Sequence, residues 1–178
     1  MVQESGFPGM KVLEFAFDTR DSGSANDYLP HNYIENCVVY TGTHDNETIA
    51  GWLDSIPKED VQAVRDYLCD QHTPKKLLYK SLISMAMRSC AKLCIIPMQD
   101  YLGFDNTCRI NTPSTVGENW KWRLKGGELT DQLQKEIHEI CKRYGRLNWS
   151  NEKIAESEED EEEEDIEGIG DVGETETV

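Results

Sequence analysis

A histidine, an aspartate and an asparagine stand side by side as His44, Asp45 and Asn46, just after an apolar run. The run 37–39 contains β-branched residues typical of a short buried strand, and the stretch 47–54 that follows is typical of a helix. The carboxylate therefore lies where a strand ends and a helix begins, which is the edge of a parallel sheet at which active sites are built. This position predicts that Asp45 contacts a substrate.

The same residues also fit a purely structural role. Asp and Asn at such a turn often serve only as helix caps or Asx turns, and Asn46 is placed to cap the following helix. His44 beside an acid is compatible with a structural histidine. A metal site is not expected, because His31, His44 and Asp45 provide no helical i, i+4 pair and the cysteines form no C-x-x-C pair.

The net charge of -16 is concentrated at the C-terminus. Residues 151–178 contain 14 acidic residues and one lysine, which leaves a net charge of only -3 on the rest of the chain. Like charges repel, and almost nothing in this segment can be buried, so a disordered acidic tail is expected. The sequence thus predicts two parts, a folded part over residues 1–150 and the tail over 151–178.

The composition of residues 1–150 argues against two classes of partner and indicates a compartment. A nearly neutral body has no electrostatic field for nucleic acid, and no apolar stretch reaches the ~18 residues of a membrane span. The N-terminus does not resemble a signal peptide, and the six cysteines are scattered. Reduced thiols and a cytoplasmic location are the simplest expectation.

Apolar runs predict three strands and periodic stripes predict the helices between them. The strands are expected over residues 10–17, 36–40 and 92–97, and their nearly continuous apolar character is typical of strands covered on both faces. Helices are expected over residues 58–69, 73–88 and 129–144. Thr73 and Thr130 are the expected N-caps of the last two, and Gly145 is the expected stop signal. A long loop is expected over residues 100–118.

Strands that alternate with helical stretches predict a parallel sheet with helical crossovers. Three such strands cannot close a barrel, whereas a (β/α)₈ barrel needs eight strands and roughly 250 residues. The expected fold is therefore α/β, namely the C-terminal part (about the last three β/α units) of a (β/α)₈ TIM barrel, with the remainder of the barrel upstream. The start of the chain at Met1, immediately before a strand, fits a truncated or separately translated piece.

Five segments stand out along the chain, namely residues 6–15 (GFPGMKVLEF), 28–33 (YLPHNY), 40–48 (YTGTHDNET), 109–117 (RINTPSTVG) and 119–123 (NWKWR). In this order they resemble the 4-α-glucanotransferases, which form the amylomaltase or disproportionating-enzyme family, glycoside hydrolase family 77. The acidic tail is not part of the family pattern.

This resemblance implies transfer of α-1,4-glucan segments between maltodextrins or starch by a retaining double displacement, without metal or cofactor. It implies that Asp45 stabilises the oxocarbenium-like transition state and that His44 hydrogen-bonds the same sugar. Asn46, Asn111 and Pro113 are the further substrate-binding residues that it implies. Phe15 and Phe17, at the end of the first strand, are candidates for sugar stacking.

Three further aromatic and acidic residues have two interpretations each. Trp120 and Trp122 alternate with basic residues, and we expect them to pack against the barrel wall and not to stack on sugar. Asp100, after the third strand, either orients a loop or contacts substrate.

The chain departs from the family pattern in two places. The family's nucleophilic Asp and acid/base Glu lie on earlier strands, and no residue here matches them, so the isolated chain is predicted to be inactive. Ser114 stands where the family usually has glycine, which is unfavourable if that position needs a positive φ.

Two other interpretations remain open from the sequence. One is a fragment of an amylase-like hydrolase, in which a His-Asp pair also occurs. The other is a non-catalytic module that binds glucan or uses its acidic tail for interaction, an interpretation favoured by the missing carboxylates.

Overall fold

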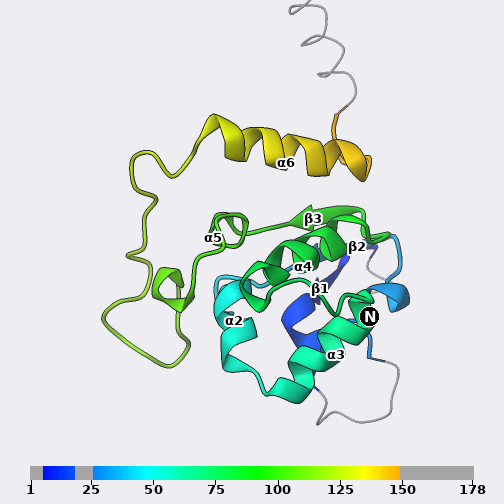
Figure 1. Ribbon diagram of the computed structural model, residues 1–178, viewed down its shortest axis with the longest axis horizontal. Helices are drawn as coiled ribbons and strands as arrows, with labels where there is room; N and C mark the ends of the chain where they lie inside the picture. Colours follow the sequence, from blue (N-terminus) through cyan, green and yellow to red (C-terminus); the bar gives the residue numbers. More distant parts are fainter. Residues whose placement is uncertain (1–5, 19–25, 149–178) are drawn as a thin grey trace, which may run out of the picture.

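The computed structural model describes residues 6–18 and 26–148, which form a small parallel sheet with helices packed around it (Figure 1). The predicted acidic tail and its boundary after residue 150 lie outside the described residues. The sheet has the order β1-β2-β3, and all neighbouring strands are parallel. The strands are β1 (Gly9–Val12), β2 (Cys37–Tyr40) and β3 (Leu93–Ile95).

The strand prediction is confirmed for β2 and β3, but the first strand is shorter than expected. It ends at Val12, and the chain continues as the 3-10 helix η1 (Leu13–Ala16). The backbone N–H of Glu14 donates to the carbonyl of Thr41 at 3.3 Å, so the chain turns across the end of β2. Phe17 is 5% exposed and belongs to the core, so the expectation that it stacks on a sugar is wrong.

The helices follow the predicted stripes, with shifts at their ends. They are α2 (Ile49–Ser55), α3 (Lys58–Leu68), α4 (Leu78–Met87), α5 (Met98–Tyr101) and α6 (Asp131–Arg143), with the 3-10 turns η2 (Pro30–Asn32), η3 (Lys75–Leu77) and η4 (Asn106–Cys108). The expected inward residues Val64, Leu78, Leu82 and Met85 are all fully buried. The predicted long loop over residues 100–118 is not fully irregular, because it contains the end of α5 and the turn η4.

The predicted helix over residues 73–88 begins later than its Thr-Pro start signal suggested. Thr73 does not cap it, because α4 begins only at Leu78 and its N-cap is Leu77. The backbone N–H of Thr73 instead donates to Asp70 at 2.9 Å, and its carbonyl accepts from Arg65 at 2.8 Å. At α6 the predicted cap is confirmed, since the hydroxyl of Thr130 accepts from the N–H of Leu133 at 3.1 Å. Gly145 follows this helix with φ 66°, as expected of a stop signal.

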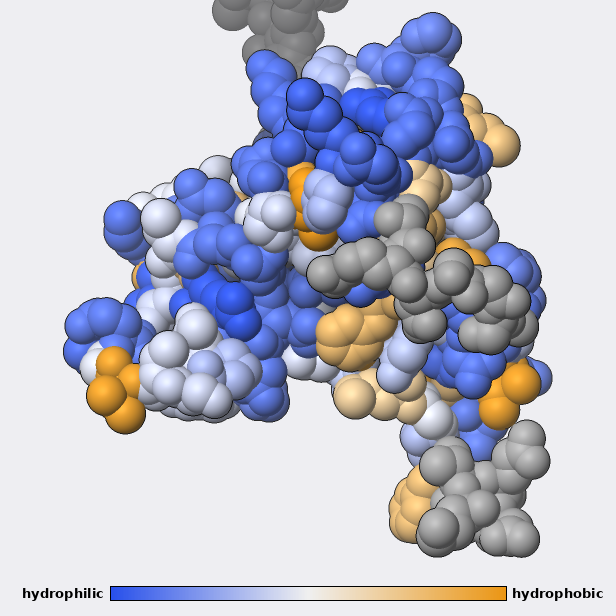
Figure 2. All heavy atoms as spheres, turned by 90° about the horizontal axis from the view of Figure 1, so that it is seen from below, coloured by the Kyte–Doolittle hydropathy of each residue, from blue (hydrophilic) through white to orange (hydrophobic). Residues whose placement is uncertain are grey.

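The strands were expected to be covered on both faces, and this is wrong for the described residues. On one face, Cys37 and Val39 are fully buried within the core cluster, which includes residues of α2, α3 and α4. On the other face, Met10, Leu93 and Ile95 are 60%, 51% and 40% exposed. An apolar run shows that a face needs a partner and does not show which element supplies it. The face of the molecule seen in Figure 2 is mainly hydrophilic, with hydrophobic residues in separate groups.

Helix α6 lies beyond β3, at the end of the long segment that leaves α5 (Figure 1). Arg146, just after this helix, joins it to the turn between α4 and β3. Its guanidinium donates to the carbonyls of Met87, Ser89 and Ala91 at 2.6, 3.0 and 3.1 Å. One side chain thereby satisfies three backbone acceptors at the end of α4.

All six cysteines are free thiols. No helix in the described residues is long and apolar enough to cross a membrane.

Candidate active site

The predicted site residues lie at the carboxyl-terminal edge of the parallel sheet. Strand β2 ends at Tyr40 and leads into the loop of residues 41–48, which carries the His-Asp-Asn sequence. Glu14 follows the end of β1, and Asp100 follows the end of β3. Because the strands are parallel, these three connections meet at one edge, which is where ligands bind in α/β sheets.

Asp45 is half exposed and is positioned by side chains from two loops. Its Oδ1 accepts a hydrogen bond from Asn111 Nδ2 at 2.6 Å and lies 3.3 Å from His44 Nε2. The side chain is 51% exposed. Among the described residues its other oxygen, Oδ2, has no hydrogen-bond partner, so the carboxylate presents a free acceptor to the outside.

The Arg109 guanidinium holds the two site loops together. It donates to the carbonyl of Asp45 at 2.6 Å and to that of Asn111 at 2.7 Å, and it lies 3.9 Å from a carboxylate oxygen of Glu47. A rigid fork of donors is suited to this, because it fixes several acceptors at defined angles. The backbone at Asp45 is therefore fixed relative to Asn111. No sequence signal singled out Arg109 for this role.

Asn46 does not cap the following helix, contrary to the expectation from sequence. Its Oδ1 accepts from the backbone N–H and the hydroxyl of Thr43 at 3.0 and 2.6 Å, and its Nδ2 donates to Glu14 Oε2 at 3.2 Å. Helix α2 is capped by Thr48, whose hydroxyl accepts from the N–H of Gly51 at 3.1 Å. Asn46 shapes the loop from within, and both ends of its amide are engaged with protein atoms.

Two acids beneath the loop are buried, and burial changes their ionisation. Glu14 is 8% exposed, and its Oε1 has no hydrogen-bond partner in the described structure. Burial raises the pKa of Glu14 to about 8, even though the hydrogen bond from Asn46 and the charge of Arg109 act to lower it. At neutral pH the side chain is thus mainly a neutral carboxylic acid.

Asp100 orients the loop, which is the first of the two roles considered for it. Its Oδ1 accepts from the backbone N–H of Ile49 at 2.8 Å, and its Oδ2 accepts from the hydroxyl of Thr41. Burial raises the pKa of Asp100 to about 6, and these hydrogen bonds act in the opposite direction. The side chain is 1% exposed, so it is inaccessible to a ligand in this arrangement.

The loop of residues 109–123 carries Asn111 and Pro113 and is braced from inside by Asn119. Asn119 Oδ1 accepts from the N–H of Thr112 at 2.9 Å, and its Nδ2 donates to the carbonyl of Thr115 at 3.0 Å. Pro113 is exposed and precedes Ser114, whose φ is 63°. The position does adopt the left-handed conformation that favours glycine.

The structure brings Trp120 to the site and leaves Phe15 beside it. The Trp120 ring lies 5.1 Å from the His44 ring and is 57% exposed, so the expected packing against the barrel wall is not what is observed. Phe15 is 47% exposed and makes an edge-on contact with Tyr28 at 5.3 Å. The sequence gives no indication that Trp120 meets His44, because 76 residues separate them.

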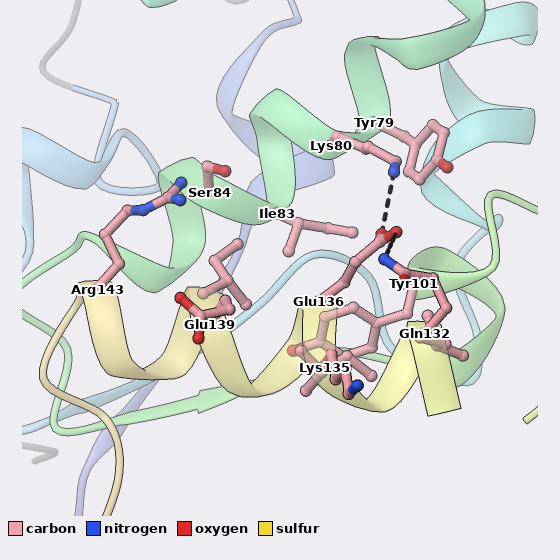
Figure 3. A pocket seen from close by; sticks show the side chains of 13 residues that line it. Tyr79, Lys80, Ile83, Ser84, Tyr101, Gln132, Lys135, Glu136, Glu139 and Arg143 are labelled. Carbon is pink, nitrogen blue, oxygen red and sulfur yellow. Dashed lines mark hydrogen bonds and ion pairs between the residues drawn. The ribbon is translucent and has the colours of Figure 1, made fainter. Parts of the chain in front are cut away.

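The site contains a small hollow, and the described residues around it form no metal cluster. A hollow of about 30 Å³ lies under the loop, lined in part by His44, Asn46 and Arg109. Over residues 6–18 and 26–148, no three His, Cys, Asp or Glu side chains are grouped as a metal site requires. A cavity of about 490 Å³ lies elsewhere, between α4 and α6, where Lys80 and Glu136 form a 3.2 Å ion pair (Figure 3). Its lining comes from α4, α5 and α6 and includes none of the predicted site residues, so its size does not make it the candidate site.

The family model described as 4-alpha-glucanotransferase matches residues 1–130 of the chain. The chain belongs to the 4-alpha-glucanotransferase family. It is 44% identical over 143 residues to the chloroplastic/amyloplastic 4-alpha-glucanotransferase of Solanum tuberosum. The aligned region covers 79% of this chain and 24% of that protein. It is 45% identical over 147 residues to the 4-alpha-glucanotransferase of a Synechocystis species, over 80% of this chain and 28% of that protein.

Solved structures give the same result. The amylomaltase from Streptococcus agalactiae in complex with acarbose is similar with a TM-score of 0.75 and 34% sequence identity, over 83% of this chain and 29% of that one. The amylomaltase of Corynebacterium glutamicum, at 17% identity and a TM-score of 0.52, shares the fold. The chain therefore spans about a quarter of the length of the curated relatives it matches.

Proposed function

We propose that this 4-alpha-glucanotransferase-family segment supplies the transition-state-stabilising acid, Asp45, of an enzyme that transfers α-1,4-glucan segments between maltodextrins or starch chains. The observation that carries the proposal is the half-exposed Asp45 carboxylate at the carboxyl-terminal edge of a parallel sheet, held by Asn111 and His44. The names of the family and the relatives support the reaction, and the acarbose complex of the Streptococcus agalactiae amylomaltase supports a glucan-like ligand.

In a retaining transfer, charge develops on the sugar ring as the glycosidic bond breaks. The Asp45 carboxylate would face the sugar where that positive charge forms, and its Oδ2 is free to accept a hydrogen bond from a ring hydroxyl. Asn111 and Arg109 fix the group before substrate arrives, so little reorganisation is needed at the moment of reaction. Such an interaction strengthens in the transition state and acts on rate more than on ground-state binding.

The other predicted site residues have more modest roles in this proposal. His44, 3.3 Å from Asp45, would hydrogen-bond the same sugar, and Phe15 would present an aromatic face at the end of β1. Pro113 would shape the loop beside the donor glucan. Asn46, whose amide is engaged by Thr43 and Glu14, would contribute chiefly by holding the loop.

We also propose that residues 1–150 are the last three β/α units of a (β/α)₈ barrel and that the chain is inactive without the rest of that barrel. The exposed apolar face of the sheet is what the inner wall of a barrel would present when other strands are absent. Double displacement needs a nucleophile and an acid/base. The nearby acids Glu14 and Asp100 are both buried, which argues against either of them taking those roles.

The test is complementation. The 178-residue chain is assayed for disproportionation of maltotriose, alone and after co-expression with the part of the Synechocystis relative that the chain does not cover. Activity in the mixture only, reduced at least about 100-fold by Asp45→Asn, is expected for loss of a group that acts on transition-state charge. The control is Asp54→Asn, the same change on an exposed residue of α2 that pairs with Lys75.

Three outcomes would contradict parts of this proposal. Full activity of the Asp45→Asn mixture would remove the role of Asp45. Activity of the chain alone would disprove the need for other strands. A mixture that binds maltodextrin without turning it over would favour the non-catalytic glucan-binding module.

A further inference from the structure

Trp120 is an exposed aromatic residue at the candidate site. Its ring centroid lies 5.1 Å from that of His44, with the two planes inclined by 39°. His44 in turn lies 3.3 Å from Asp45. More than half of the Trp120 side chain is open to water, which is unusual for the largest aromatic residue.

The backbone at Trp120 is held in an unfavourable conformation. Its φ of 65° lies in the left-handed region, where a bulky residue is a genuine outlier. Two hydrogen bonds keep it there: its N–H donates to the carbonyl of Ile110 at 2.7 Å, and its carbonyl accepts from Arg123 at 2.8 Å. Strain of this kind persists only where the surroundings determine it, and it concentrates at ligand-binding sites.

The loop that carries Trp120 is the one that supplies Asn111 to Asp45. Asn119, the preceding residue, is bonded to Thr112 and Thr115, so the two ends of the loop are fixed to each other. The Asn111 amide, which orients Asp45, and the exposed Trp120 indole therefore belong to one rigid loop.

We propose that Trp120 is a sugar-stacking residue that binds the apolar C–H face of a glucose unit next to the one held by Asp45 and His44. This inference rests on the proposed function and adds a substrate contact to it. A pyranose has hydroxyl groups around its edge and C–H groups on its faces, so a flat indole can cover a face while polar groups bind the edge. The residue fixes the position of the glucan chain and takes no part in bond breaking.

The test measures binding of acarbose to the full chain, with intrinsic tryptophan fluorescence as one readout and calorimetry as the other. For Trp120→Ala we expect the dissociation constant to rise about tenfold, in line with the loss of one aromatic contact. For Trp120→Phe we expect the affinity to stay within about threefold and the ligand-induced fluorescence change to disappear. This second variant separates direct contact from a merely structural role.

The matched control is Val116→Ala on the same loop, where the side chain is 97% exposed. It should leave both readouts unchanged, and circular dichroism of every variant should match the parent chain. If the parent binds and Trp120→Ala binds equally well, the stacking role is disproved while the proposed function stands. If the parent chain binds no acarbose at all, this inference fails for the chain, while the proposed function is judged separately by transfer activity in the complemented mixture.

Discussion

Asn111 and Asp45 are 66 positions apart in sequence, and the amide of one donates a 2.6 Å hydrogen bond to the carboxylate of the other. The contact orients Asp45 and leaves its second oxygen free. The pair therefore keeps the Asp45 carboxylate in a fixed orientation at the edge of the sheet.

Removal of this donor should reduce transfer more than it reduces binding. We expect Asn111→Ala to lower kcat in the complemented enzyme by about 10- to 100-fold, the equivalent of about 1–3 kcal/mol for a lost hydrogen bond to a charged group. Steady-state kinetics with maltotriose measure this. Glu118→Gln, on the same loop with a side chain 92% exposed, serves as the control and should change neither constant. An effect confined to KM would contradict the orienting role.

The buried Glu14 should make stability depend on pH. Its pKa of about 8 in the folded state lies above the ordinary value of 4.5, so the folded chain holds the proton more tightly than the unfolded chain does. The resulting stabilisation is complete below about pH 4.5 and is lost as pH rises through about 8. Glu14→Gln keeps a neutral side chain of the same shape and removes that loss.

Urea denaturation at pH 5, 7 and 9 tests this. The Gln variant should gain stability relative to the parent as pH rises, by about 2–5 kcal/mol over the whole range. Asp100, whose pKa is raised to about 6, is present in both proteins, and its charge is one of the causes that raise the pKa of Glu14. A difference between the two proteins that stays constant from pH 5 to pH 9 would refute a perturbed Glu14.

Ser114 should be a site of avoidable strain. At φ 63° a serine side chain meets the backbone, whereas glycine adopts this conformation without that cost. We expect Ser114→Gly to stabilise the chain by about 0.5–1 kcal/mol in thermal or chemical denaturation. Ser114→Ala retains a Cβ and should be neutral; equal effects of the two substitutions would show that φ is not the cause.

Arg146 should hold α6 on the rest of the chain. Arg146→Ala leaves the carbonyls of Met87, Ser89 and Ala91 without their charged donor, and we expect a loss of about 2 kcal/mol. Hydrogen exchange should then accelerate across Asp131–Arg143 while β2 remains protected. Arg143→Ala, an exposed position in the same helix, should have little effect on either measurement.

The sequence was informative wherever a local pattern determines the outcome. The parallel sheet, the apolar stripes of α3 and α4, the Thr130 cap and the Gly145 stop were predicted from patterns along the sequence, and all are observed. The family and the position of Asp45 at the strand edge were also predictable, since they depend on contiguous motifs.

The failures share one physical cause, which is that tertiary contacts override local preference. The first strand was expected to continue to Phe17, but the N–H of Glu14 bonds to Thr41 and turns the chain. Asn46 was expected to cap a helix, but Thr43 and Glu14 engage its amide. Trp120 and Arg109 reach the site across long loops, and nothing in the sequence near either residue indicates where those loops close.

The long separation of Asp45 from Asn111 and Arg109 bears on the order in which the chain folds. Closing so large a loop costs conformational entropy that local helix formation does not, so contacts of this kind form slowly. Refolding should therefore restore backbone structure first and ligand affinity last. A partly refolded chain would contain its helices and strands, but the Asp45 side chain would not yet be oriented by Asn111 and Arg109.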